Sequence, residues 1–147
     1  MEYLQKITFV LMLFNGFACA SNDLKTYQLQ TSVIHLISAP EHHYNKNIVV
    51  DGIFIGFNQN NLFFDAKHAE YMLNAMSINI LDDSDDESLT NSSCSGEWVE
   101  VWGTFIKTID PEISYFKGRI VVDKMILHKN GKTCWKRIKP SFLDKAK

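Results

Sequence analysis

The sequence lacks the short motifs that most directly indicate a biochemical activity. It contains no Gly-x-Ser-x-Gly, no phosphate-binding loop, no His-Glu-x-x-His and no Cys-x-x-Cys. No nucleophile with its base, nucleotide-binding loop or redox pair is therefore recognisable. The histidines lack the organised spacing of four zinc ligands; they are His35, His42, His43, His68 and His128. We predict no catalytic residues, no cofactor and no metal centre built on histidine.

The sequence also lacks a strong net charge and a long apolar run. Its formal net charge is -2 over 147 residues, so it has no general attraction for nucleic acid or for an anionic membrane. The apolar run at residues 7–17 is shorter than the roughly 20 residues that span a bilayer, and no later segment reaches that length. We therefore expect no nucleic-acid partner and no integral membrane segment.

The first twenty residues have the pattern of a secretory signal peptide. Lys6 precedes the apolar run, and Ala18-Cys19-Ala20 gives the small-x-small motif after which signal peptidase cuts. Lipid anchoring at Cys19 is the lesser alternative, because Gly16 stands where bacterial lipoproteins usually carry a Leu-like residue. We expect a protein exported to the periplasm or the extracellular space, with a signal peptide at 1–20, one domain at 21–140 and a basic tail at 141–147.

Cysteine is scarce, and two of the three cysteines remain after the predicted signal peptide is removed. Cys94 and Cys134 form an even pair in an oxidising compartment. A bridge between them would close a loop of about 40 residues and stabilise the fold by roughly 3–4 kcal/mol in the chain-entropy model. We predict this disulfide, with two free thiols as the alternative.

Alternation of apolar and polar residues predicts five main strands. They lie at residues 47–57, 62–64, 77–81, 98–106 and 118–127, with a short further strand at 133–138. Gly52, Gly56 and Gly103 inside the strands predict bends or bulges that let a small sheet curl over its own core. Thr31 or Ser32 is suited to cap one short helix and Asp65 another. The pattern predicts a mainly β fold, a small closed barrel with one or two short helices.

Four segments resemble a group of small exported bacterial proteins of uncharacterised function. They are Val-Ile-His-Leu-Ile-Ser-Ala-Pro-Glu at 33–41, Tyr-Asn-Lys-Asn-Ile-Val-Val-Asp-Gly at 44–52, Leu-Phe-Phe at 62–64 with the short polar helix expected after it, and Val-Glu-Val-Trp-Gly-Thr-Phe at 99–105. The likeness runs from about Val33 to about Leu127. It implies an OB-like fold, a five-stranded Greek-key barrel, and implies nothing about activity.

Charge is distributed unevenly along the chain. Acidic residues gather at Asp82, Asp83, Asp85, Asp86 and Glu87, and basic residues at Lys129, Lys132, Lys136, Arg137, Lys139, Lys145 and Lys147. The simpler interpretation is two solvated surface segments, one of which neutralises the other. Deleting residues 82–87 would then leave thermal stability nearly unchanged. Weak calcium binding at Asp82, Asp83, Asp85 and Asp86 is the sharper hypothesis, although the EF-hand glycine and spaced Glu are absent.

Four side chains are weak candidates for ligand binding. Trp98, Glu100 and Trp102 share one face of a predicted strand and are suited to stacking on a sugar. The alternative is that the tryptophans cover the end of the barrel with Glu100 at its rim. Phe63 is the fourth candidate, on a strand where OB barrels commonly bind ligands, although a core position is the simpler interpretation.

These observations predict an exported, non-enzymatic OB-like module that binds an unidentified envelope or extracellular partner. Two alternatives stay open. A small hydrolase acting on cell-envelope material would need a concave pocket with a perturbed carboxyl or histidine. A structural subunit of a surface assembly would need a large exposed apolar patch.

Overall fold

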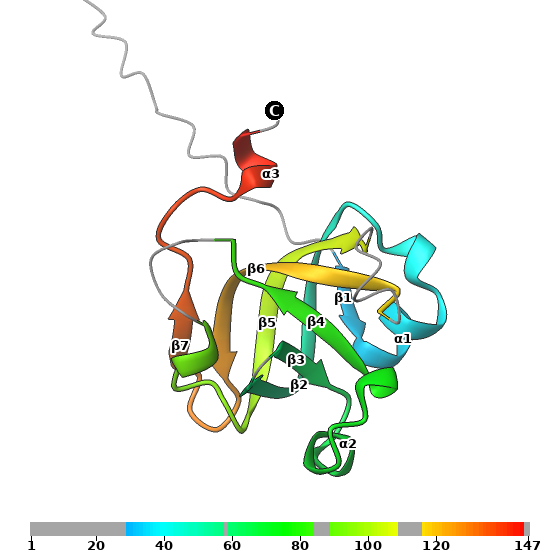
Figure 1. Ribbon diagram of the computed structural model, residues 1–147. Helices are drawn as coiled ribbons and strands as arrows, with labels where there is room; N and C mark the ends of the chain where they lie inside the picture. Colours follow the sequence, from blue (N-terminus) through cyan, green and yellow to red (C-terminus); the bar gives the residue numbers. More distant parts are fainter. Residues whose placement is uncertain (1–28, 58, 84–88, 109–115, 146–147) are drawn as a thin grey trace, which may run out of the picture.

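Five strands pair in the ring order β2-β3-β4-β6-β5, which a further β2–β5 pairing closes. They are β2 (Lys46–Phe57), β3 (Gln59–Phe63), β4 (Ser77–Leu81), β5 (Glu97–Lys107) and β6 (Gly118–Leu127). The β4–β6 pair is parallel and the other pairs of the ring are antiparallel. This order and these directions are those of an OB-type Greek-key barrel (Figure 1), so the predicted fold class is confirmed.

This computed structural model describes residues 29–57, 59–83, 89–108 and 116–145. The predicted signal peptide with Cys19, the start of the predicted domain, and Asp85 and Asp86 of the hypothetical calcium site lie outside the described residues. Among the residues that are described, no helix is both long enough and apolar enough to cross a membrane.

Two short strands and several short helices surround the barrel. β1 (Leu29–Ser32) runs parallel to β2, and β7 (Thr133–Lys136) runs antiparallel to β6. The α-helices are α1 (Val33–Ser38), α2 (Ala66–Glu70) and α3 (Phe142–Lys145), and the 3-10 helices are η1 (Pro40–His42), η2 (Asn74–Met76) and η3 (Leu89–Asn91). The sequence predicted one or two short helices, and the structure has three α-helices. The additional one is α3, which forms within the segment predicted to be a basic tail. Figure 1 shows α2 and α3 near opposite ends of the molecule.

Local sequence signals explain where the helices begin. The Ser32 hydroxyl accepts a hydrogen bond from the backbone N–H of His35 at 3.2 Å, and the Asp65 carboxylate accepts one from the N–H of His68 at 2.9 Å. Both are N-caps of the expected kind. Beyond the first cap, Val33 and Leu36 of α1 are fully buried in the core of the barrel, so this helix packs an apolar stripe against the inside of the sheet.

Strand β3 begins earlier than the sequence predicts. The sequence predicts this strand at residues 62–64, because Asn-Gln-Asn-Asn at 58–61 has the composition of a turn, yet β3 starts at Gln59. Asn60 and Asn61 are accommodated in the strand because other segments hydrogen-bond them. Asn79 on β4 donates to the Asn60 carbonyl, and the Asn61 amide donates to the Asn74 side chain. Partners that lie 13 or more residues away leave no local signal.

Gly103, the glycine predicted to bend β5, marks a bulge. The β5–β6 register shifts between Trp102 and Gly103, and a Cβ at Gly103 would lie 2.4 Å from the Val121 carbonyl oxygen. Gly52 differs, because the pairing of β2 is unbroken there. A Cβ at Gly52 would lie 2.5 Å from the Phe63 carbonyl oxygen, so this glycine permits a close approach of β2 and β3.

Replacing Gly103 with alanine is therefore expected to destabilise the barrel. The added methyl group must displace backbone of β6, and overpacking of this kind costs about 1–3 kcal/mol. The free energy of unfolding from urea denaturation measures the effect. Lys107→Ala, at an exposed position of the same strand, is the matched control and should stay within about 0.5 kcal/mol of wild type. Equal stability of the two variants would contradict the role assigned to Gly103.

Candidate functional site

The outer surface of β2, β5 and β6 carries the residues that the sequence singled out. Val99 and Val101 of β5 are fully buried in the barrel, so alternation places Trp98, Glu100 and Trp102 together on the outside. Register adds neighbours from the flanking strands, with Asp51 opposite Glu100 and Lys124 opposite Trp102. We call this surface the tryptophan face and define it by Asp51, Trp98, Glu100, Trp102, Lys124 and His128.

Trp102 is held by its neighbours. Its indole N–H donates to the Glu100 carboxylate at 2.5 Å, and the Lys124 ammonium lies 3.7 Å from the centroid of its ring. The second contact is a cation–π interaction, which favours Lys or Arg over an indole face. Lys124 therefore occupies one side of the Trp102 ring, and this tryptophan supports the site rather than offering an open platform.

Trp98 is the open aromatic residue of the face. The residue is 40% exposed, and its ring meets the His128 imidazole in a T-shaped contact with centroids 6.2 Å apart. Nε2 of His128 donates to the Asp51 carboxylate at 2.7 Å, while the His128 backbone N–H donates to the Trp98 carbonyl. An exposed indole thus stands beside a fixed imidazole–carboxylate pair.

Phe63, the fourth candidate, is fully buried and is not available to a ligand from solvent. The outer side of β3 and β4, where OB barrels commonly bind ligands, is closed in this protein. Asn61, Ser77 and Asn79 are buried there, and the connection between the two strands is hydrogen-bonded to this side through Asn74. The exposed sheet surface is instead the tryptophan face.

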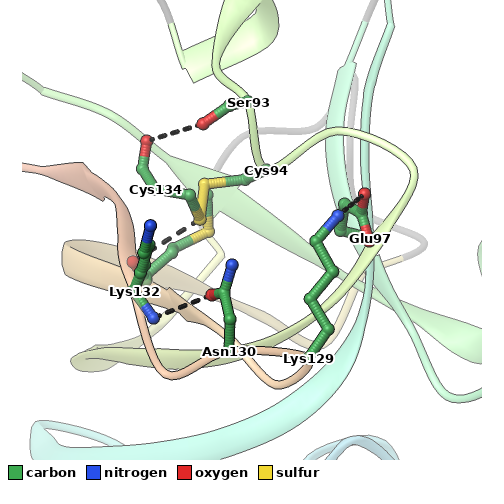
Figure 2. The surroundings of a disulfide bond; sticks show 8 residues. Ser93, Cys94, Glu97, Lys129, Asn130, Lys132 and Cys134 are labelled. Atoms are coloured by element: carbon green, nitrogen blue, oxygen red, sulfur yellow. Dashed lines mark hydrogen bonds and ion pairs between the residues drawn. A yellow bond between two sulfur atoms is a disulfide. The ribbon is translucent and has the colours of Figure 1, made fainter.

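The predicted disulfide is present and lies next to this face. Cys94 and Cys134 are bonded with Cα atoms 5.4 Å apart, and Cys94 is fully buried. Figure 2 shows the bridge joining the segment before β5 to β7, with Lys129 reaching from the β6–β7 turn to Glu97. The bridge therefore ties the segment that leads into β5 to β7, while the His128–Trp98 backbone hydrogen bond holds the start of β5 against the turn after β6.

Asp83 of the acidic segment and Arg137 of the basic C-terminal region meet in a buried ion pair. The Asp83 and Arg137 side chains are only 9% and 6% exposed, and Arg137 pairs with both Asp83 and Asp123. Arg137 also donates to the Val122 carbonyl at 2.9 Å, and the second Asp83 oxygen accepts from the Phe142 N–H. Arg137 therefore neutralises Asp83, and the prediction that the two segments are solvated is wrong at these two residues.

This ion pair corrects two expectations about the acidic segment. The Asp83 carboxylate is occupied by Arg137 and the start of α3, so it is not free to bind calcium. Within the described part of the chain, no group of three or more His, Cys, Asp or Glu residues could hold a metal ion. Deleting residues 82–87 would remove Asp83 and leave Arg137 partly unpaired. We therefore expect the deletion to lower thermal stability, where the sequence predicted almost no change. Arg137 lies two residues after buried Trp135, so alternation places both side chains on the same side of the chain. This spacing was the one local signal that Arg137 is buried.

Two groups away from the tryptophan face have shifted pKa values, and both have structural roles. The pKa of Asp65 is lowered, chiefly because the backbone N–H of His68 donates to its carboxylate. The pKa of Tyr44 is raised by burial and then by the nearby Glu41 charge. Tyr44 stacks on Phe105 with ring centroids 5.5 Å apart and donates to the Lys117 carbonyl. Neither shift belongs to an arrangement suited to hydrolysis.

Comparison with known proteins shows no family for the chain. No protein-family model matches it, and no curated protein matches it. One solved structure, assigned as an aspartyl-tRNA synthetase from Leishmania major Friedlin, aligns with 83% of this chain at 12% identity and a TM-score of 0.42. The aligned region is 23% of that longer chain, and a likeness at this level carries no argument about fold or function. The resemblance to exported bacterial proteins stays a prediction.

Proposed function

We propose that the chain is an exported, non-enzymatic binding module that presents its tryptophan face to an envelope or extracellular partner. The observation that carries the proposal is the exposed Trp98 ring, held on a rigid strand beside the His128–Asp51 pair. Rigid aromatic side chains lose little conformational entropy on binding and are enriched among the residues that dominate binding energy. A site on a closed barrel is also better fixed than one on a loop.

Export is supported by two independent features. One is the signal-peptide pattern of residues 1–20. The other is the Cys94–Cys134 disulfide, whose buried Cys94 is part of the packed core. Structural disulfides form and persist in oxidising compartments and are rare in the cytosol, so this bridge suits a protein that folds after secretion.

A binding role is favoured over hydrolysis by the polar groups of the face itself. The Glu100 carboxylate accepts from the Trp102 indole, and the Asp51 carboxylate accepts from the His128 imidazole. Both carboxylates are thus fixed as hydrogen-bond acceptors beside an aromatic ring.

A second candidate, a subunit of a surface assembly, is favoured by one specific observation. Four large apolar residues near α2 are at least 39% exposed: Phe64, Tyr71, Met72 and Leu73. Tyr71 is 63% exposed. Exposed apolar residues that gather in one place commonly mark a contact with another protein.

Trp98→Ala is expected to reduce capture of the partner at least tenfold, because it removes the open aromatic anchor. The measurement is retention of the disulfide-bonded, tagged chain on the envelope or extracellular fraction of its source. Tyr71→Ala is the matched control, since it removes an exposed aromatic residue from the other surface. Near-UV circular dichroism confirms that both variants keep the fold. Retention that depends on Tyr71 and not on Trp98 would contradict the proposal and favour the assembly subunit.

A further inference from the structure

The tryptophan face carries an arrangement that the barrel does not need for its own stability. Asp51 and Glu100 are directly opposite each other on β2 and β5. Like charges in that position destabilise a pair of strands. Both carboxylates nevertheless lie on the outside of the barrel, Glu100 between the two tryptophans of β5 and Asp51 beside it on β2. Local features that oppose folding are expected where a protein binds a ligand.

Each carboxylate of this face has a neighbour that holds it in place. His128 lies 2.7 Å from Asp51, and Lys124 stands over the Trp102 ring whose N–H is bonded to Glu100. Both carboxylates are thus engaged as hydrogen-bond acceptors, by the imidazole and by the indole. Lys124 is the one lysine or arginine among the six residues that define this face, so the face lacks the basic cluster that would attract a polyanion, and it is suited to a ligand that brings hydroxyl donors.

The same groups keep hydrogen-bonding capacity for such a ligand. The Asp51–His128 contact uses Oδ1, and the Glu100–Trp102 bond uses Oε1. An ionised carboxylate offers about four acceptor sites on its two oxygens, so each can accept further bonds from hydroxyl groups. Two positions along a strand are about 7 Å apart, which places Glu100 one pyranose ring away from Trp98. Asp51 lies at the same level on the neighbouring strand.

We propose that the tryptophan face binds a neutral carbohydrate, with the C–H side of a pyranose ring on Trp98 and hydroxyl groups donating to Asp51 and Glu100. A sugar presents both an apolar side and a rim of hydroxyl donors, which match an open indole next to fixed carboxylates. This inference rests on the proposed binding function and names the chemical class of its ligand. It places that ligand on β2, β5 and β6, because the outer side of β3 and β4 is closed.

The test is a set of treatments of the envelope or extracellular fraction before the chain is added. Separate samples are digested with proteinase K, extracted with chloroform and methanol, oxidised with periodate, or digested with a muramidase, and then washed. The wild-type chain and the Trp98→Ala, Trp98→Phe and Asp51→Asn variants are applied to each sample. Trp98→Phe keeps an aromatic ring and Asp51→Asn keeps the side-chain shape, so neither variant challenges the fold.

A carbohydrate ligand predicts that capture survives proteinase K and solvent extraction and falls at least tenfold after periodate or muramidase. Trp98→Ala should lose at least tenfold, Asp51→Asn should lose several-fold, and Trp98→Phe should keep most of the capture. Capture that depends on Trp98 but is abolished by proteinase K, or survives both glycan treatments, would overturn the carbohydrate and leave the binding function standing. Capture that is indifferent to Trp98 would overturn both.

Discussion

Replacing Arg137 with methionine is expected to lower the free energy of unfolding by about 3–5 kcal/mol, the usual cost of breaking a buried ion pair from one side. The guanidinium is the shared partner of Asp83, Asp123 and the Val122 carbonyl. Its removal leaves two carboxylates facing a site from which water is largely excluded. Methionine retains much of the side-chain volume, so the loss reports on charge and hydrogen bonding more than on packing.

Urea denaturation at two salt concentrations tests this expectation. The buried pair should be screened little by salt, whereas an exposed pair such as Lys129–Glu97 should be screened strongly. The destabilisation caused by Arg137→Met should therefore persist at 1 M NaCl. Lys136→Met, an exposed neighbour on β7, is the matched control and should change stability by no more than about 0.5 kcal/mol.

A second variant distinguishes an ion pair from simple packing. Adding Asp83→Asn to Arg137→Met removes one stranded charge and keeps an acceptor for the Phe142 N–H. The double variant should therefore recover part of the lost stability. If the double variant is the less stable of the two, the cost lies in packing and the account of Arg137 as a charge partner is wrong.

Removing the disulfide with the pair Cys94→Ala and Cys134→Ala is expected to cost about 3–4 kcal/mol, because the unfolded chain regains the freedom of the closed loop. The bonded residues are separated by 40 positions in sequence. In a domain of this size the loss should lower the melting temperature by about 10 °C or more. Alanine avoids the burial of a serine hydroxyl at the position of Cys94, which is fully buried.

Thermal unfolding of the wild type and of the double variant, each with and without dithiothreitol, measures the contribution of the disulfide within one experiment. Reductant should bring the wild-type melting temperature close to that of the variant and should leave the variant itself unchanged. Capture by the tryptophan face should also weaken, since the bridge anchors to β7 the segment that leads into β5, four residues before Trp98. A wild-type melting temperature that is insensitive to complete reduction would show that the bridge contributes little.

The strands could be predicted well because their signal is local. Period-2 alternation located β4 and β6 to the residue, and glycine inside β5 located its bulge. The caps Ser32 and Asp65 were recognisable because a capping side chain bonds a backbone group three residues ahead. The disulfide was predictable for a different reason, since two cysteines allow one intramolecular pairing.

The errors share a cause, which is that their partners are remote in sequence. Asn60 and Asn61 have the composition of a turn, and their place in β3 depends on hydrogen bonds from Asn79 and to Asn74. Asp83 lies in a solvated-looking acidic run, and its burial depends on Arg137 more than 50 residues later. Contacts across such distances are set by how the strands are ordered, and composition does not encode that order.

The candidate site could be predicted in part, because some of its features depend on alternation within one strand and others on contacts with neighbouring strands. Alternation placed Trp98, Glu100 and Trp102 on one side of a strand, but it could not say which tryptophan is open. That distinction comes from Lys124 on β6, which covers Trp102, and from the His128–Asp51 pair, which joins the turn after β6 to β2 beside Trp98. Phe63 was a reasonable candidate by position, and the closure of the β3–β4 side removed it.

By itself, the sequence determined where most strands of the barrel lie, where α1 and α2 begin and which cysteines can pair, because each depends on neighbours along the chain or on a single available partner. Only the tertiary structure decided that the sheet closes through β2 and β5, that Arg137 is buried against Asp83, and that Trp98 is the tryptophan left open. The physical reason is that burial and electrostatic partners belong to groups brought together from separate strands, and their energies exist only once the barrel has closed.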